Sequence, residues 1–173
     1  MSGKEKNIIL CGFMGCGKTT VGRLLARETG RKFIDMDSFI EERAGKTVAQ
    51  IFAQEGEPRF RALEHEAAQA LAREAGLVVA AGGGALVRRE NAECLGRTGV
   101  IVLLDAPLEE LKKRLKNDAS RPLLQKPDRD AVIEALHRER MPLYRQAAHL
   151  TVPAGGPPLA VAREVLRQVK SGG

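Results

Sequence analysis

The sequence is poor in aromatic residues and has no long apolar run. Phe, Tyr and Trp make up 3% of its 173 residues, with one Tyr and no Trp. Proteins that bind single-stranded nucleic acid stack bases on aromatic side chains, so a net charge of +6 alone is a weak argument for such a partner. No apolar stretch approaches the roughly 18 residues that a membrane-spanning helix needs. We therefore expect no nucleic-acid partner and no membrane segment.

Cysteine is also scarce. The three cysteines, Cys11, Cys16 and Cys94, show neither C-x-x-C spacing nor a cluster with histidines that would indicate a zinc site. Their odd number argues against a disulfide framework and for a reducing compartment. Residues 1–6 lead directly into an apolar run without an export signal. We expect a cytoplasmic protein that is a monomer.

The chain has the length of one domain and shows no linker or internal repeat. Short apolar runs alternate with segments of helical periodicity, which is typical of a parallel sheet covered by helices on both faces. The sequence therefore predicts an α/β fold in which residues 1–173 form a single domain. The runs expected to form strands are residues 8–10, 32–35, 77–81, 100–105 and 150–152.

The most informative stretch joins the first apolar run to a helix. Gly12–Thr19 reads GFMGCGKT and matches the phosphate-loop pattern G-x-x-x-x-G-K-[ST] in the strand, loop and helix context that this pattern requires. The backbone N–H groups of such a loop and the following helix N-terminus bind phosphate oxygens. Lys18 would reach the β- and γ-phosphates, and the Thr19 hydroxyl would hold Mg²⁺. The stretch thus predicts that ATP binds with Mg²⁺.

The expected nucleotide contacts extend from this loop into the helix. The alternative is a glycine-rich turn that merely joins a strand to a helix, and the Lys-Thr pair argues against it. A helix N-terminus can activate a thiol, but we interpret Cys16 as a small filler residue. The expected nucleotide-binding residues here are Gly12, Met14, Gly15, Cys16, Gly17, Lys18, Thr19 and Thr20.

Two carboxylates, Asp35 and Asp37, follow the second apolar run. If both lie on a strand, they point to the same face at the carboxyl edge, where parallel sheets bind ligands. The alternative is that Asp37 caps the next helix. Asp105 also ends an apolar run, so on pattern alone it rivals Asp35 as the residue near Mg²⁺.

The middle of the chain supplies further polar groups. Thr47–Gln50 has the spacing of a capping box and opens a short helix. On the following helix Arg61 and Glu64 are neighbours, and a surface ion pair is their simplest interpretation. The triple glycine Gly82–Gly84 follows the third strand. Consecutive glycines allow a substrate to approach the main chain, although a flexible turn is the alternative.

The later part of the chain is rich in arginine. Residues 117–128 form a polar stretch bounded by prolines, and a connection of this length is often a mobile cover of an active site. Helical periodicity resumes at residue 130 and continues to about residue 148. Arg114 stands four residues after Glu110, so an ordinary surface pair is its simplest interpretation.

Together these groups suggest phosphoryl transfer to a small hydroxylated acid. If the sheet gathers Asp37, Arg61, the triple glycine and an arginine of the long helix, two guanidinium groups can bind a carboxylate. Asp37 would orient the attacking hydroxyl and could accept its proton. Lys18, Mg²⁺ and a lid arginine would neutralise charge on the transferred phosphoryl group.

With these motifs the chain resembles the shikimate kinases over nearly its whole length. The resemblance implies a three-layer αβα fold with strand order 2-3-1-4-5 and a mobile lid. It also implies transfer of the γ-phosphate of ATP to the 3-hydroxyl of shikimate, in the pathway to chorismate and aromatic amino acids. The shared motifs are Gly12–Thr19, Asp35-Met36-Asp37, Gly56-Glu57 with Phe60-Arg61 and Glu64, Gly82-Gly83-Gly84, Arg121-Pro122-Leu123-Leu124 and Arg140-Met141-Pro142-Leu143-Tyr144.

The resemblance further implies individual roles. It places Thr19 and Asp35 at Mg²⁺, Asp35 through water, and so favours Asp35 over Asp105. Arg114 would stack on adenine, and Phe52 and Phe60 would wall the acceptor pocket. The residues implied to bind shikimate are Asp37, Arg61, Gly82, Gly83, Gly84 and Arg140. Lys18 and Arg121 would contact the transferred phosphate, and the expected catalytic residues are Lys18, Asp37 and Arg121.

One departure and three alternatives accompany this hypothesis. Such kinases often carry another arginine near adenine after the last strand, where this chain has Ala154–Pro158. Gluconate kinases share the phosphate loop, but they usually carry Asp-Gly-Asp and a nearby histidine, whereas here Met36 separates the acids and no histidine precedes His65. A nucleotide-sensing or nucleic-acid-binding module would bind ATP without acceptor-dependent turnover. A simple ATPase would release phosphate without stimulation by shikimate.

Overall fold

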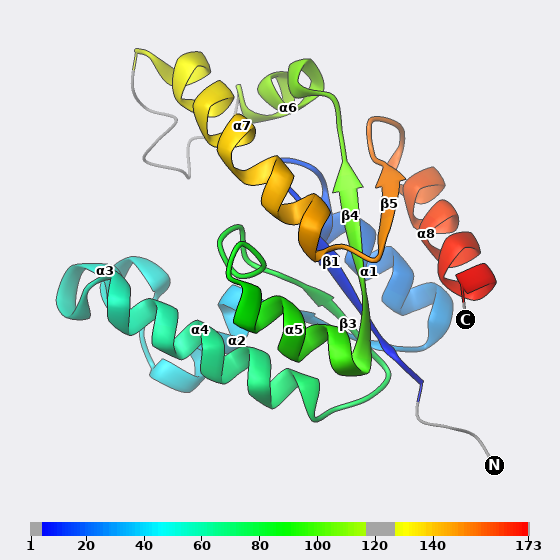
Figure 1. Cartoon of the computed structure of the whole chain (residues 1–173), viewed down its shortest axis with the longest axis horizontal. Helices are drawn as coiled ribbons and strands as arrows, with labels where there is room; N and C mark the ends of the chain where they lie inside the picture. The colour runs from blue at the N-terminus through cyan, green and yellow to red at the C-terminus, as the bar shows by residue number, and fades with distance from the viewer. Residues whose placement is uncertain (1–4, 117–126, 173) are drawn as a thin grey trace.

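The computed structural model describes residues 5–116 and 127–172, and its centre is a parallel sheet (Figure 1). The five strands lie in the order β2-β3-β1-β4-β5. Each neighbouring pair is parallel. The predicted sheet and the strand order are therefore confirmed. The strands are β1 Asn7–Cys11, β2 Lys32–Asp35, β3 Leu77–Ala80, β4 Gly99–Asp105 and β5 Leu150–Pro153.

Helices cover both faces of the sheet and make it the middle of three layers (Figure 1). On one face α1 and α8 pack against each other, and on the other α5 and α7 contact β4, with α4 packed against α5. None of the helices in the described part of the chain is long and apolar enough to cross a membrane. The helices are α1 Lys18–Thr29, α2 Met36–Ala44, α3 Val48–Glu55, α4 Glu57–Ala72, α5 Arg89–Thr98, α6 Leu108–Leu115, α7 Arg129–Ala147 and α8 Pro158–Gly172.

The strand register places three functional loops side by side. Residues 8–10 of β1 are fully buried in the apolar core. Leu10 pairs with Ala80 of β3, and the Ala81 N–H donates to the Leu10 carbonyl at 2.9 Å. Ala80 also pairs with Asp35 at the end of β2. The phosphate loop, the two aspartates and the triple glycine therefore start from adjacent strand ends at the carboxyl edge of the sheet.

The predicted capping box at the start of α3 is confirmed, and its hydrogen bonds are short-range in the sequence. In the capping box of α3, Gln50 N donates to Thr47 Oγ1 at 3.1 Å, and Thr47 N donates to Gln50 Oε1 at 2.9 Å. Helix α5 has no counterpart among the predicted elements. It buries only Asn91 and Leu95, so its sequence lacks the apolar stripe from which a helix is usually recognised.

The prediction that Asp35 and Asp37 lie two apart on one strand is wrong for Asp37. Strand β2 ends at Asp35, whose Oδ1 accepts a hydrogen bond from Ser38 N at 3.0 Å and thereby caps α2. Helix α2 begins at Met36, and Asp37 lies in its first turn. The alternative, that an aspartate caps the next helix, is thus correct, but the capping residue is Asp35 and not Asp37. Both acids still lie at the carboxyl edge.

Candidate active site

The phosphate loop is held in its curve by glycines. Gly12, Gly15 and Gly17 have φ values of 148°, 83° and 99°, which residues with a side chain rarely adopt. A Cβ atom at Gly12 would also lie 2.8 Å from the backbone oxygen of Leu104. Helix α1 begins directly after Gly17, which provides no side-chain cap, so its first N–H groups are available to an anion.

A cleft of about 660 Å³ lies over this loop and the start of α1. Lys18 Nζ donates to the Gly12 carbonyl at 2.7 Å and lies 4.0 Å from Cys16 Sγ, so the ammonium group stays on the loop. Cys16 itself is buried, in agreement with its interpretation as a filler residue. The cleft is lined by Gly15, Cys16, Gly17, Lys18, Thr19, Thr20, Val21, Glu110, Arg114, Ala154, Gly155, Gly156, Pro157, Pro158 and Val161.

Arg114 joins three parts of this cleft, so the predicted pair with Glu110 is present but is only one of its contacts. Its Nη1 donates to the Gly15 carbonyl at 3.1 Å, and its Nη2 donates to the Ala154 carbonyl at 3.0 Å. Its Nε donates to Glu110 at 3.2 Å, which is the predicted pair. The guanidinium group therefore ties α6 to the phosphate loop and to the segment after β5.

The triple glycine is the meeting point of three side chains from three different helices. A Cβ atom at Gly82 would lie 2.7 Å from Asp37 Oδ1, and one at Gly84 would lie 2.5 Å from Arg61 Nη1. A Cβ atom at Gly83 would lie 3.3 Å from Arg140 Nη1. None of the three glycines has a positive φ, so close approach and not backbone conformation explains them. The predicted gathering of Asp37, Arg61 and an arginine of the long helix is present.

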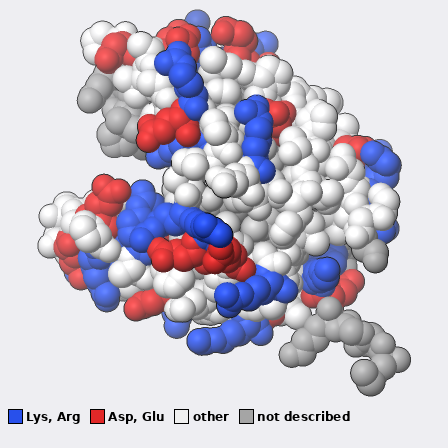
Figure 2. Space-filling model, in the orientation of Figure 1, with Lys and Arg blue, Asp and Glu red and all other residues white. Residues whose placement is uncertain are grey.

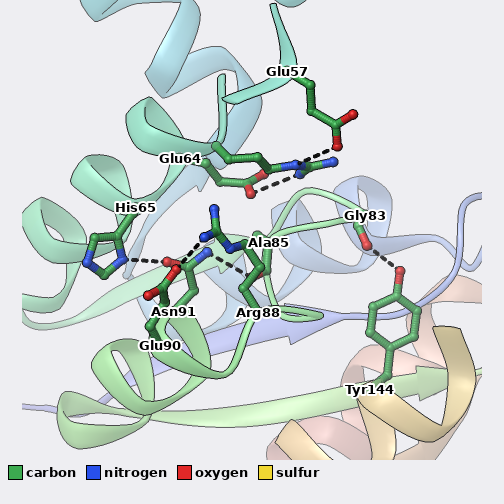
Figure 3. A network of polar contacts seen from close by, with 10 residues as sticks. Glu57, Glu64, His65, Gly83, Ala85, Arg88, Glu90, Asn91 and Tyr144 are labelled. Carbon is green, nitrogen blue, oxygen red and sulfur yellow. Dashed lines mark hydrogen bonds and ion pairs between the residues drawn. The ribbon is translucent and has the colours of Figure 1, made fainter. Parts of the chain in front are cut away.

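Arg61 is held by two acids of its own helix, Glu57 and Glu64, which are labelled in Figure 3. Its Nη1 lies 3.0 Å from Glu64 Oε1, and its Nε lies 3.5 Å from Glu57 Oε1. The Glu64 side chain is only 1% exposed, so the interpretation of this pair as a surface ion pair is wrong. Burial raises the pKa of the Glu64 carboxyl above its ordinary value, although the Arg61 guanidinium opposes this shift. Glu64 therefore fixes the guanidinium from a buried position.

A second polar contact supports the loop that follows the triple glycine (Figure 3). Asn91 of α5 is fully buried, and its Nδ2 donates to the Ala85 carbonyl at 2.9 Å. Its Oδ1 lies 2.7 Å from His65 Nδ1, which connects the loop to α4. Sequence reasoning missed these residues because one Asn and one His, 26 positions apart, form no recognisable motif.

Several other predicted residues have clear positions. The rings of Phe52 and Phe60 pack with centroids 4.8 Å apart, and the Arg61 guanidinium lies 5.3 Å from the Phe60 centroid. Asp105 lies 3.9 Å from Arg145 Nη2 of α7, so this rival acid takes part in an ion pair with the helix. Arg121 and residues 117–126 of the expected lid lie outside the described residues.

The surface shows where these groups lie in the molecule. Figure 2 shows a hollow between the part that contains α3 and α4 and the part that contains α6 and the start of α7. Basic and acidic side chains lie next to each other along its lower margin. The nucleotide cleft described above is lined by the phosphate loop, α6 and the segment after β5, and the triple glycine follows β3, the strand next to the one that precedes this loop.

Comparisons with known proteins agree with this geometry. The family model for shikimate kinase matches residues 14–170. The shikimate kinase of Psychrobacter cryohalolentis is 42% identical over 95% of this chain and 89% of that protein, and the shikimate kinase of Symbiobacterium thermophilum is 49% identical over 84% of this chain and 85% of that protein. A shikimate kinase structure from Acinetobacter baumannii, in complex with shikimate, has a TM-score of 0.89 and 40% identity over 97% of this chain and 94% of that one. This chain belongs to the shikimate kinase family.

Proposed function

We propose that this chain transfers the γ-phosphate of ATP to the 3-hydroxyl of shikimate and releases shikimate 3-phosphate and ADP. The observation that carries the proposal is the convergence of Asp37, Arg61 and Arg140 on the triple glycine, beside the phosphate loop. Membership of the shikimate kinase family supports the same reaction. The reaction would supply the shikimate pathway of aromatic amino-acid synthesis.

On the acceptor side, Arg61 and Arg140 would bind the carboxylate of shikimate. Their guanidinium groups lie against the neighbouring glycines Gly83 and Gly84. A planar guanidinium group can bind a carboxylate through two parallel N–H donors. Asp37 would accept a hydrogen bond from the attacking hydroxyl, orient it and take up its proton as the bond to phosphorus forms. In phosphoryl transfer the transition state is loose, so this orientation contributes more than the basicity of Asp37.

On the donor side, the loop N–H groups, the α1 N-terminus and Lys18 would hold the phosphates of ATP. Lys18 would exchange its contact with the Gly12 carbonyl for the β- and γ-phosphates. The family motif supports a further role for Arg121, which would neutralise charge on the transferred group from the proposed lid, residues 117–128. Arg114, together with the backbone and prolines of Ala154–Pro158, would form the adenine end of the cleft.

Mg²⁺ is the expected companion of ATP, and the residues present fit it. The candidate donors are the Thr19 hydroxyl, which lines the nucleotide cleft, and the Asp35 carboxylate at the end of β2. Both are hard oxygen donors, and Mg²⁺ usually retains several water molecules in addition to one or two such ligands. When bound, the ion would neutralise charge on the β- and γ-phosphates. Asp35 uses Oδ1 to cap α2, which orients its carboxylate.

The assignment is tested by measuring ADP production in a coupled assay with ATP and Mg²⁺. We expect rapid ADP release with shikimate, and background release without an acceptor or with gluconate in its place. Turnover with gluconate and none with shikimate would make the chain a gluconate kinase. Release that shikimate does not stimulate would make it a simple ATPase, and ATP binding without turnover would make it a nucleotide sensor.

Replacing Arg114 by Met is expected to raise KM for ATP about tenfold, because two backbone carbonyls of the cleft then lose their donor. KM for shikimate should change little, since Arg114 does not contact the triple glycine. Steady-state kinetics with each substrate varied in turn measure both constants. Lys113→Met is the matched control, because Lys113 is the exposed neighbour on α6 and lies outside the cleft lining. A larger effect on KM for shikimate than on KM for ATP would contradict the role of Arg114.

Acceptor binding is expected to weaken as the pH falls. Because burial raises the pKa of Glu64, this carboxyl takes up a proton at a higher pH than an exposed glutamate does. Protonation removes the buried one of the two anionic partners of Arg61, so KM for shikimate should rise as the pH falls through that raised pKa. In Glu64→Gln, KM should be high at all pH values and lack this dependence. An identical pH profile of KM in both enzymes would contradict the prediction.

We also propose that the protein acts in the cytoplasm as a monomer of one domain, residues 1–173. Cys11, Cys16 and Cys94 are all free, which agrees with a reducing compartment. Burial raises the pKa of the Cys11 thiol to about 12, so that it stays protonated and unreactive. Light scattering coupled to gel filtration should give the mass of a single chain, with or without shikimate.

A further inference from the structure

The chain contains one tyrosine, Tyr144, and it lies next to the triple glycine. Its side chain is 1% exposed, and its hydroxyl donates a hydrogen bond to the Gly83 carbonyl (Figure 3). Burial raises the pKa of this hydroxyl to about 12, although the Arg140 guanidinium opposes the shift. Tyr144 is therefore a protonated donor at any pH at which the enzyme would work.

The acceptor of this bond occupies a particular place in the proposed site. The peptide group between Gly83 and Gly84 is planar and trans, as the chain has no cis peptide bond, so its C=O and N–H groups point in opposite directions. Arg140 lies against Gly83 and Arg61 lies against Gly84. The hydroxyl of Tyr144 thus fixes the orientation of the one peptide group that lies between the two guanidinium groups.

The helix that supplies Tyr144 also supplies one of these arginines. Arg140 and Tyr144 are four residues apart on α7, so they lie one turn apart on the same face. A Cβ atom at Gly83 would lie 3.3 Å from Arg140 Nη1 and 4.0 Å from the Tyr144 hydroxyl. The hydrogen bond therefore connects this turn of α7 to the loop after β3. Asp37 and Arg61, the other two side chains at the triple glycine, come from α2 and α4.

We propose that the Tyr144 hydroxyl is a positioning group for the acceptor: it holds the Gly83–Gly84 peptide and, through it, the spacing of Arg61 and Arg140. This inference rests on the proposed function. Tyr144 is not a catalytic residue here, because it acts through Gly83 and Arg140 and not on shikimate. The ring has a separate role in the core, where it is packed among buried apolar side chains. Tyr144→Phe keeps the ring and removes only the hydroxyl.

We expect Tyr144→Phe to raise KM for shikimate about tenfold, with KM for ATP unchanged, because a buried carbonyl without its donor lets the peptide and Arg140 shift. The matched control is Thr98→Val. Thr98 Oγ1 also donates to a backbone carbonyl, that of Ala72 at 2.8 Å, but at the far end of α5. Thr98→Val should leave both KM values unchanged. An unchanged KM for shikimate in Tyr144→Phe, or an equal rise in both KM values, would overturn the proposal.

A measurement on the unmodified protein covers the case in which Tyr144→Phe fails to fold. Because the chain has one Tyr and no Trp, its tyrosine fluorescence reports on Tyr144 alone. We expect this emission to change and saturate as shikimate is added, and to change little on addition of ADP. No response to saturating shikimate would overturn the proposal. If the wild-type enzyme shows no shikimate-dependent ADP release, the proposed function fails, whereas normal activity with a normal Tyr144→Phe variant refutes only the positioning role.

Discussion

Asp37→Asn is expected to lower kcat by a factor of about 100 or more, because an amide cannot accept the proton of the attacking hydroxyl. Asn has the same shape as Asp, so the side chain can remain against Gly82, where a Cβ atom would lie 2.7 Å from Asp37 Oδ1. ATP binding should be close to normal, since the phosphate loop is unchanged. The ADP-release assay gives kcat, and calorimetric titration with a non-hydrolysable ATP analogue gives the nucleotide affinity.

The matched control for this change is Asp130→Asn. Asp130 lies in the first turn of α7, is 63% exposed and, within the described part of the chain, pairs with the neighbouring Arg129, so its replacement should leave kcat unchanged. An Asp37→Asn enzyme with nearly full activity would remove Asp37 from the mechanism. A loss of ATP affinity as large as the loss of kcat would show instead that Asp37 supports the fold of the phosphate loop.

Gly84→Ala is expected to lower kcat/KM for shikimate about a hundredfold, because displacing a binding group by about an ångström can cost this much. The new methyl group would lie 2.5 Å from Arg61 Nη1 and 2.9 Å from Nη2. Arg61 is held from behind by buried Glu64, so the guanidinium must leave this partner in order to move. The flexible arginine yields before the backbone does, so the main loss should be in acceptor binding, with a smaller loss of thermal stability because buried Glu64 loses its charged partner.

Gly22→Ala provides a contrast for this prediction. A Cβ atom at Gly22 of α1 would also lie 2.5 Å from its nearest neighbour, but that atom is Cε1 of the Phe33 ring on β2. A ring that packs against the core cannot rotate away as a guanidinium can, so this variant should lose thermal stability and keep its KM for shikimate. Thermal melts and kinetics of both variants separate the two effects. If Gly84→Ala lowers the melting temperature as much as Gly22→Ala does, the triple glycine is needed for packing of the core and is not part of the acceptor-binding site.

The features that could be predicted from the sequence depend on neighbours along the chain. The phosphate loop, the capping box of α3 and the apolar strands are encoded in a few consecutive residues. The triple glycine correctly indicated a close approach to the main chain. The sequence suggested that Asp37, Arg61 and an arginine of the long helix gather there, but only the packed structure shows which glycine each side chain approaches, because they come from α2, α4 and α7.

The features that were predicted wrongly or missed depend on tertiary packing. Spacing alone made Arg61 and Glu64 neighbours, yet only the packed structure shows that Glu64 is buried. The prediction that Asp37 lies on a strand with Asp35 was wrong, because β2 ends at Asp35, which caps α2. Tyr144 was only part of a shared motif, since a hydrogen bond to a glycine carbonyl 61 positions away leaves no sign in local sequence.

The loop after β3 has a consequence for how acceptor preference can change. Gly82, Gly83 and Gly84 present only main chain, so whatever selectivity the pocket has must come from the helices around it. Those helices belong to separate stretches of the chain, and each contributes one charged group. A new acceptor could therefore be accommodated by altering α2, α4 or α7 one at a time, while the sheet and the nucleotide end remain as they are. The main chain of the three glycines would then form the same part of the pocket whichever acceptor is bound.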